Sequence, residues 1–268
     1  MDARTIHRQP WSPDVRTAAA WSLLAGLSTL AIMPYLLQLM PDMFEKLPVS
    51  LPAFVLGQVV QAIVLVGLLS LLGLRMGHRV GLGSPLMHAW LGGTAPPDIP
   101  TLRPFQAIGL GALAAVVMLG GTLVLDPLLP EPLYAIEDPG AGRTILNGFL
   151  ASFYGGIAEE LLARLFAMTL VVWLLCGFGR CRPRPAVFWV GIVLAGVLFG
   201  AGHLPPAVEL WGLTPIVMVR TVVLNLIGAV VFSWLYWRRG IEMAMLGHFS
   251  ADIVVHVLAP LVLSAPMH

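Results

Sequence analysis

Seven long apolar segments dominate the sequence and constrain its fold more than any other feature. Each is long enough to cross the hydrocarbon core of a bilayer, which takes about 20 helical residues. The segments cover residues 17–40, 51–74, 105–126, 144–175, 186–203, 216–237 and 241–263. They predict an all-α, polytopic membrane helical bundle of seven helices. An eighth helix would arise if the long segment 144–175 broke near Gly155-Gly156.

The composition supports a single integral membrane domain over residues 1–268. Hydrophobic residues make up 58% of the chain and charged residues only 11%, whereas a soluble domain has roughly a quarter charged residues. So few charges cannot cover a water-soluble surface, and the lipid bilayer is the expected environment. The net charge of +1 gives no reason to expect a nucleic-acid partner.

Basic residues alternate between the two sets of loops that connect the segments. Eleven lie on the side of the N-terminus and two, Lys46 and Arg143, lie on the other side. The eleven are Arg4, Arg8, Arg16, Arg75, Arg79, Arg103, Arg180, Arg182, Arg184, Arg238 and Arg239. Positively charged loops stay in the cytoplasm, so we expect a multi-pass protein of the plasma or inner membrane with a cytoplasmic N-terminus.

Polar side chains within the apolar segments form a short list. An ionised group in the membrane costs several kcal/mol, so it usually faces the bundle interior and marks a functional site. These residues are Gln58, Gln61, Asn147, Glu159, Glu160, Arg164, His203, Arg220, Asn225, His248, Asp252 and His256.

Helical spacing predicts different roles for the adjacent residues Glu159 and Glu160. Glu160 and Arg164 are four residues apart, so they share a helix face and can form an ion pair. Glu159 lies about 100° around the same helix and remains available. The ion pair has two interpretations, either a structural clamp between helices or a part of a catalytic site.

Two later segments add histidines and an aspartate. His203 follows Phe199 by four residues, and Pro205-Pro206 are expected to end that helix. His248 and Asp252 share one face of segment 241–263. At 1.5 Å per residue, Asp252 lies roughly 18 Å from the cytoplasmic end of its helix, while His203 lies nearer the opposite side. They can meet only if helices are tilted or broken, or if the fifth segment begins later.

A cavity that gathered these groups could hydrolyse a carbonyl compound, most naturally a peptide bond. Glu159 would take a proton from water that His203 orients, while His248 with Asp252 would hold the substrate carbonyl and stabilise the oxyanion. Alternatively, Glu159, His203 and His248 would bind a divalent metal such as Zn²⁺ and leave one position open for water. The residue pattern leaves both routes open.

The remaining polar residues have simpler interpretations. Gln58, Gln61 and Asn225 are typical of hydrogen bonds between membrane helices. Arg220 is expected to reach the outer interface or to pair with a carboxylate such as Glu209, and His256 to be a packing residue.

The ordered motifs EExxxR (Glu159, Glu160, Arg164), FxxxH (Phe199, His203) and HxxxD (His248, Asp252) resemble those of the CAAX protease and bacteriocin-processing (CPBP) family. The resemblance covers roughly residues 144–256, and Asp252 stands where Asn is common in the family. It implies an intramembrane endopeptidase with residues 144–263 as catalytic core and residues 1–143 as variable spans. By this resemblance Glu159, Glu160, Arg164, His203, His248 and Asp252 are catalytic, either with a metal or with glutamate alone. The substrate would be a leader peptide or a membrane-protein segment.

Two other functions remain as alternatives. A non-catalytic membrane protein, such as an immunity or scaffold protein, would keep the fold without needing Glu159. A proton-coupled transporter also uses acid and histidine chains. The first three segments carry no polar set that matches that of the last four, and this argues against an inverted-repeat transporter.

Overall fold

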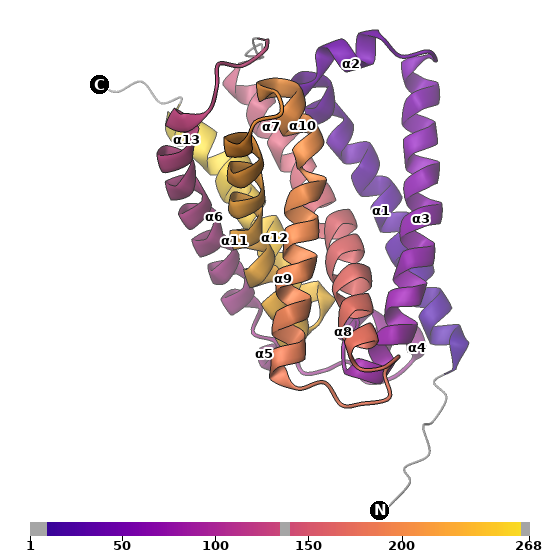
Figure 1. The fold of residues 1–268 in the computed structure, drawn as a ribbon. Coiled ribbons are helices and arrows are strands. Elements are labelled where there is room, and N and C mark those ends of the chain that lie inside the picture. Colours follow the sequence, from indigo (N-terminus) through magenta and orange to yellow (C-terminus); the bar gives the residue numbers. More distant parts are fainter. Residues whose placement is uncertain (1–9, 135–139, 264–268) are drawn as a thin grey trace, which may run out of the picture.

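The computed structural model describes residues 10–134 and 140–263, and over these residues it is a bundle of helices (Figure 1). The first half contains α1 (Trp11–Leu39), α2 (Pro41–Glu45), α3 (Leu51–Val80), α4 (Pro85–Gly92), α5 (Ile99–Leu102), α6 (Pro104–Leu125) and the 3₁₀ turn η1 (Asp126–Leu128). The second half contains α7 (Ala141–Phe153), the π-helical segments η2 (Tyr154–Glu159) and η3 (Leu161–Met168), α8 (Thr169–Leu175), α9 (Pro185–Gly202), α10 (Leu204–Trp211), α11 (Pro215–Arg239), α12 (Ile241–Asp252), the π-helical η4 (Ile253–Leu258) and α13 (Ala259–Leu263). The predicted all-α class is confirmed.

Proline and glycine explain where many of these helices begin and end. Proline lies in the first turn of α3, α4, α6, α9, α10 and α11, where its missing N–H is not needed. At the C-termini of α3 and α4, Gly81 and Gly93 have φ angles of 77° and 70°. Glycine adopts this left-handed conformation without steric cost, and so the chain turns sharply after each helix.

Six helical stretches of the described residues are long and apolar enough to cross a membrane: Trp11–Leu39, Leu51–Val80, Ile99–Leu128, Pro185–Trp211, Pro215–Arg239 and Ile241–Val262. Their outward side chains are large and apolar; Leu56 and Leu68 on α3 are 65% and 58% exposed. Lipid is as apolar as these side chains, and backbone hydrogen bonds are satisfied within each helix. The protein is therefore a multi-pass membrane protein.

A seventh helical run, residues 141–175, traverses the bundle from the end where α7 begins to the end where α8 finishes (Figure 1). It carries Glu159, Glu160 and Arg164 close together, and it consists of α-helical and π-helical pieces that are each shorter than a membrane span. No break occurs at Gly155-Gly156; the chain stays helical there but winds into the wider π form. The total of seven crossings stays a prediction.

The junction between α9 and α10 explains how His203 can meet Asp252, although the sequence placed these two residues at different depths in the membrane. His203 lies between Gly202, the last residue of α9, and Leu204, the first of α10. Pro205 and Pro206 do not end the helical passage, since they occupy the first turn of α10, where proline is tolerated. Because α10 adds eight residues beyond His203, or about 12 Å, this histidine lies inside the bundle rather than at its outer surface.

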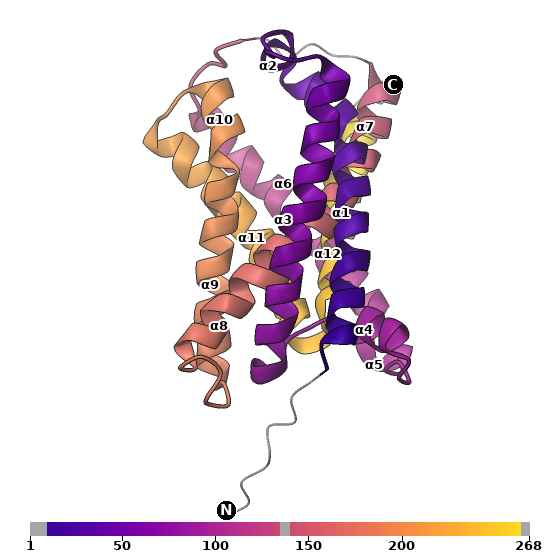
Figure 2. The ribbon, with the colours of Figure 1, turned by 90° about the vertical axis from the view of Figure 1, so that its right-hand side faces the viewer.

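Close packing between helices holds α12, which carries His248 and Asp252, against its neighbours. Helices α1 and α3 lie side by side (Figure 2), and α12 packs against α6 and α11. A Cβ on Gly111 of α6 would collide with the backbone carbonyl oxygen of Gly247 on α12. Two glycines facing each other thus let these helices approach closely.

Nine of the eleven residues in the basic set lie at the end of the bundle where α1 begins, α3 ends and α11 ends (Figure 1). Arg4 and Arg8 lie outside the described residues. One of these nine, Arg16, and also Asp14 are within α1, which begins at Trp11 rather than near residue 17 as predicted. The prediction was wrong here because residues from distant helices compensate Asp14, which local composition cannot reveal.

Candidate active site

Three separate parts of the fold bring the six predicted site residues close together. The run 141–175 contributes Glu159, Glu160 and Arg164, the α9–α10 junction contributes His203, and α12 contributes His248 and Asp252. Of the six, Glu160 and Arg164 are fully buried, His248 is almost fully buried, and Glu159, His203 and Asp252 are partly exposed. Glu160, Arg164 and His248 therefore form a closed side of the cluster, and Glu159, His203 and Asp252 form an open side.

Glu160 contacts both other residues of the closed side, Arg164 and His248. Its Oε1 lies 2.8 Å from Arg164 Nη1, which confirms the predicted pairing, and 2.8 Å from His248 Nδ1. The carboxylate thus links its own helix to α12. A buried carboxylate needs such compensation because its isolated charge is costly in a low dielectric.

Arg164 is held by aromatic rings as well as by Glu160. Its guanidinium carbon lies 4.5 Å from the centroid of the Phe199 ring and 5.4 Å from that of Phe232. None of its three nitrogens meets hydrogen-bond geometry with an acceptor in the described part of the chain. Ion pairing and cation–π contacts therefore stabilise this charge.

Glu159 faces the open side between two imidazoles. Its oxygens lie 3.8 Å from His203 Nε2 and 3.9 Å from His248 Nε2. These distances are too long for direct hydrogen bonds. They leave the carboxylate and both ring nitrogens free to share a water molecule or a substrate atom.

The other ring nitrogens fix the orientation of both histidines. His203 Nδ1 lies 2.9 Å from the Phe199 backbone oxygen, and His248 Nδ1 contacts Glu160. A carbonyl oxygen can only accept, so Nδ1 of His203 carries a proton, and in the tautomer with this single proton Nε2 is an acceptor. The His248 ring is also stacked on Phe232, with centroids 4.4 Å apart.

Asp252 approaches the site where Gly155 leaves room. Its Oδ1 lies 3.6 Å from His248 Nε2. A Cβ on Gly155 would collide with Asp252 Oδ2 and would lie 3.1 Å from His248 Nε2. The absence of a side chain at Gly155 is thus required for the position of both groups.

The three π-helical segments of the described chain all lie in the helices that carry these groups. Glu159 ends η2, Arg164 lies within η3, and Asp252 directly precedes η4. A π turn is rare and is frequent at functional sites, because it changes where a side chain points relative to the rest of its helix. A break near Gly155-Gly156 was considered from the sequence, but π-helical winding was not predicted.

A cavity of about 590 Å³ opens beside the polar cluster. Glu159, His203, His248 and Asp252 line one part of it. Side chains of α1, among them Met33, Tyr35 and Leu36, line another part. Sequence reasoning missed this wall because an apolar span shows no sign of which residues face a cavity.

The described residues offer one group of three metal-ligating side chains whose ligand atoms all lie within 4.8 Å of one another, and it is not the predicted set Glu159, His203 and His248. The donor types suit zinc, and the Nδ1 contacts of both histidines are typical of zinc ligands. The three atoms are nevertheless too widely spread to form a ligand set in this geometry.

Other predicted polar residues have structural partners. Arg220 pairs with a carboxylate, as one of the two predictions had it, but the partner is Asp126, at 2.9 Å between Nε and Oδ1, and not Glu209. The two residues meet because α11 packs against α6. His256 contacts the Tyr35 ring, as a packing residue would, and also lines the cavity.

Comparison with known proteins gave one result. Residues 141–254 match the model of a family described as type II CAAX prenyl endopeptidase Rce1-like. No curated protein and no solved structure matched the chain. The matched segment contains all six residues of the cluster and ends just after Asp252.

Proposed function

Residues 141–254 match the Rce1-like family of type II CAAX prenyl endopeptidases, and we propose that the chain is a member of this family that hydrolyses peptide bonds within the membrane with Glu159 as the base. One observation carries this proposal. The Glu159 carboxylate lies between the Nε2 atoms of His203 and His248 and lines the 590 Å³ cavity. A positioned carboxylate that reaches a shared water is suited to general base catalysis.

In the proposed reaction Glu159 and His203 hold the attacking water. Glu159 removes a proton as the water oxygen bonds to the carbonyl carbon of the scissile peptide. The carbon–nitrogen bond then breaks, and the proton passes from Glu159 to the leaving amine nitrogen. His203 orients the water by accepting a hydrogen bond at Nε2, since its Nδ1 proton is directed to the Phe199 carbonyl oxygen.

His248 stabilises the developing oxyanion in this mechanism. Carboxylates approach both of its nitrogens, Glu160 at Nδ1 and Asp252 and Glu159 at Nε2. In its protonated form this ring would donate from Nε2 toward the substrate carbonyl oxygen. Glu160 and Arg164 act as positioning residues, because they touch His248 and its surroundings but are closed off from the cavity.

A zinc ion is the alternative activator of the water, held by Glu159, His203 and His248. We assign the activation to Glu159 because these three ligand atoms are not gathered around one point. A zinc ion would act as a Lewis acid and lower the pKa of a bound water. The two mechanisms differ in their response to a chelator.

The apolar wall of the cavity favours a substrate that is itself in the membrane. We propose a lipid-anchored peptide or a membrane-protein segment, which would reach the polar cluster past the α1 side chains. Residues 144–263 then form the catalytic core, and the variable spans of 1–143 supply part of the substrate wall. The basic end of the bundle would lie in the cytoplasm, in a plasma or inner membrane.

The first experiment compares Glu159→Gln with the wild-type protein in detergent or nanodiscs. The substrates are peptides that carry or lack a C-terminal prenyl group, together with transmembrane segments. We expect kcat to fall about 10²- to 10⁴-fold, because loss of a general base removes an effect of that size. Cleavage by the wild type should persist after treatment with a chelator.

Glu209→Gln is the matched control, because Glu209 is an exposed glutamate on α10. It should cleave at the wild-type rate. Equal cleavage by Glu159→Gln and wild type would remove Glu159 from the mechanism and favour a non-catalytic role for the pair of glutamates. Zinc that is bound by the wild type but not by Glu159→Gln, together with loss of wild-type activity on chelation and recovery on adding zinc, would transfer the activation of water to a metal.

A further inference from the structure

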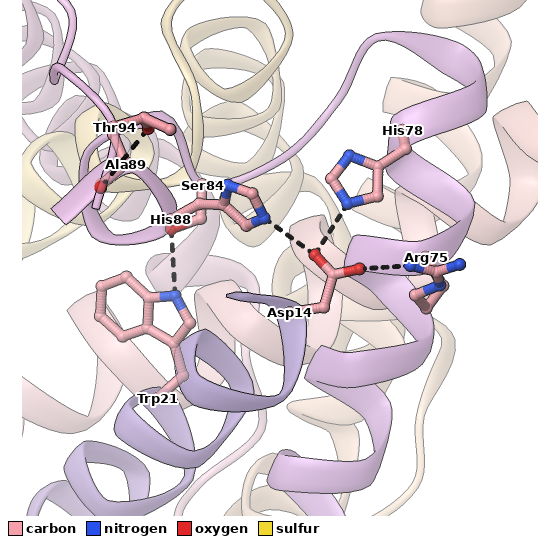
Figure 3. A network of polar contacts seen from close by, with 8 residues as sticks. All are labelled: Asp14, Trp21, Arg75, His78, Ser84, His88, Ala89 and Thr94. Atoms are coloured by element: carbon pink, nitrogen blue, oxygen red, sulfur yellow. Dashed lines mark hydrogen bonds and ion pairs between the residues drawn. The ribbon is translucent and has the colours of Figure 1, made fainter. Parts of the chain in front are cut away.

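A second polar cluster surrounds Asp14 (Figure 3), at the end of the bundle where α1 begins and α3 ends. Asp14, in the first turn of α1, is completely buried. Its Oδ1 lies 2.8 Å from His78 Nε2 and 2.9 Å from His88 Nε2, and its Oδ2 lies 2.7 Å from Arg75 Nη1. Three helices, α1, α3 and α4, thus meet at one carboxylate.

The two carboxylate oxygens have different partners. Arg75 contacts Oδ2, while both imidazoles approach Oδ1 (Figure 3). In a metal site a group such as Arg75 holds the ligand carboxylate in orientation from outside the ligand set. The Arg75 guanidinium is itself fixed over the Trp11 ring, 4.2 Å from its centroid.

The remaining three atoms have the identity and spacing of a zinc ligand set. Asp14 Oδ1 and the Nε2 atoms of His78 and His88 form the one group in the described chain whose ligand atoms all lie within 4.8 Å of one another. Tetrahedral zinc with bonds of about 2.0–2.1 Å places its ligands roughly 3.3 Å apart. The oxygen–nitrogen distances of 2.8 and 2.9 Å need to lengthen by only about half an ångström.

The surroundings leave room both for this movement and for access. The side chains of His78 and His88 are 24% and 26% exposed, so neither ring is locked by packing. Both line a cavity of about 620 Å³ bordered by α3, α4 and the end of α11. A metal ion could enter through this cavity, and a water could complete a fourth position.

We propose that Asp14, His78 and His88 bind Zn²⁺ and that the ion fastens the cytoplasmic ends of α1, α3 and α4 together. The proposal does not depend on the proposed peptidase function. It does connect to the catalytic helix, because Glu242 in the first turn of α12 accepts hydrogen bonds from Ser84 Oγ and from the N–H groups of Leu86 and Met87 in α4. Zinc binding would therefore also steady the helix that carries His248 and Asp252.

The test measures zinc in protein that carries no histidine tag, purified in detergent and stripped with a chelator. Equilibrium dialysis against Zn²⁺ should give one tightly held ion in Glu159→Gln/His203→Ala, which disables the other set of donors. Adding His88→Ala to this variant should weaken the binding at least tenfold, and so should adding His78→Ala. Arg75→Gln should weaken it about 10- to 100-fold, as loss of an orienting partner does.

A second measurement does not depend on whether the histidine variants fold. Zn²⁺ should raise the Tm of the Glu159→Gln/His203→Ala protein, and X-ray absorption of its zinc should show two imidazoles and a carboxylate. A zinc affinity that is the same with and without His78 and His88 would overturn the proposal. So would the absence of bound zinc in the Glu159→Gln/His203→Ala protein, or an absorption spectrum without imidazole ligands.

Discussion

Two buried carboxylates, Glu160 in the middle of the bundle and Asp14 at its basic end, have the same types of partner in very different settings. Each contacts an arginine and histidine nitrogen at 2.7–2.9 Å. The partners of Glu160 are nearly sealed, with 1% and 8% of the Arg164 and His248 side chains exposed. The partners of Asp14 are about a quarter exposed.

Burial of the partners, rather than the identity of the residues, therefore separates the two clusters. Where partners are sealed, their positions are fixed and removal of one leaves a charge that water cannot reach. Where they are partly hydrated, they can move apart, and water can replace a lost partner. The first arrangement suits a site that must keep its geometry, and the second suits a site that admits an ion.

The largest expected effect comes from removing the sealed arginine. Arg164→Leu should lower the free energy of unfolding by about 3–5 kcal/mol, because the buried Glu160 keeps its charge and loses its arginine partner. Arg75→Leu should cost about 1 kcal/mol or less, because solvent screens that cluster. Denaturant unfolding of both variants in the same detergent measures the difference.

The double variant Glu160→Gln/Arg164→Leu provides the control for that comparison. Because the buried Glu160 charge is also removed, this variant should recover a large part of the stability lost in Arg164→Leu. Equal losses in Arg164→Leu and Arg75→Leu would show that exposure does not distinguish the clusters.

A smaller effect is expected from disturbing the geometry of the central site alone. Gly155→Ala places a methyl group against Asp252 and His248, and a shift of about 1 Å in such groups lowers the rate about 100-fold. Gly57→Ala on α3, whose new methyl group meets no neighbour, is the control and should cleave at the wild-type rate. Cleavage assays on both variants check this; an active Gly155→Ala protein would mean that the site adapts as readily as the cluster around Asp14.

The smallest effect on stability is expected at a third ion pair, Arg220–Asp126, which is more exposed to solvent than the clusters around Glu160 and Asp14. Asp126 is 42% exposed in its pair with Arg220. Arg220→Ala should therefore cost only about 0.2–1 kcal/mol of unfolding free energy, and less at high salt. Unfolding at low and at high salt tests this, and a loss as large as that of Arg164→Leu would contradict it.

Local periodicity explains what the sequence could predict. The apolar segments matched the long helices within a few residues at most ends, and four-residue spacing identified the Glu160–Arg164 pair. Contacts between distant helices explain what it could not. The early start of α1 depends on Arg75, His78 and His88 around Asp14, and the partner of Arg220 depends on how α6 meets α11.

The π-helical turns around Glu159 have a consequence for how this chain can change. A π turn holds one more residue than the α-helical turn it replaces, so deletion of a residue from Tyr154–Glu159 would allow an ordinary α-helix to form. Because the π turn and the α turn that replaces it each complete one turn, the helical segments on either side would keep about the same relative orientation. A deletion in an α-helical part of the run would instead rotate one side by about 100° relative to the other and separate Glu159 from its neighbours in space. The run should therefore tolerate the loss of a residue better at its π turns than elsewhere, provided that Gly155 and Glu159 are kept.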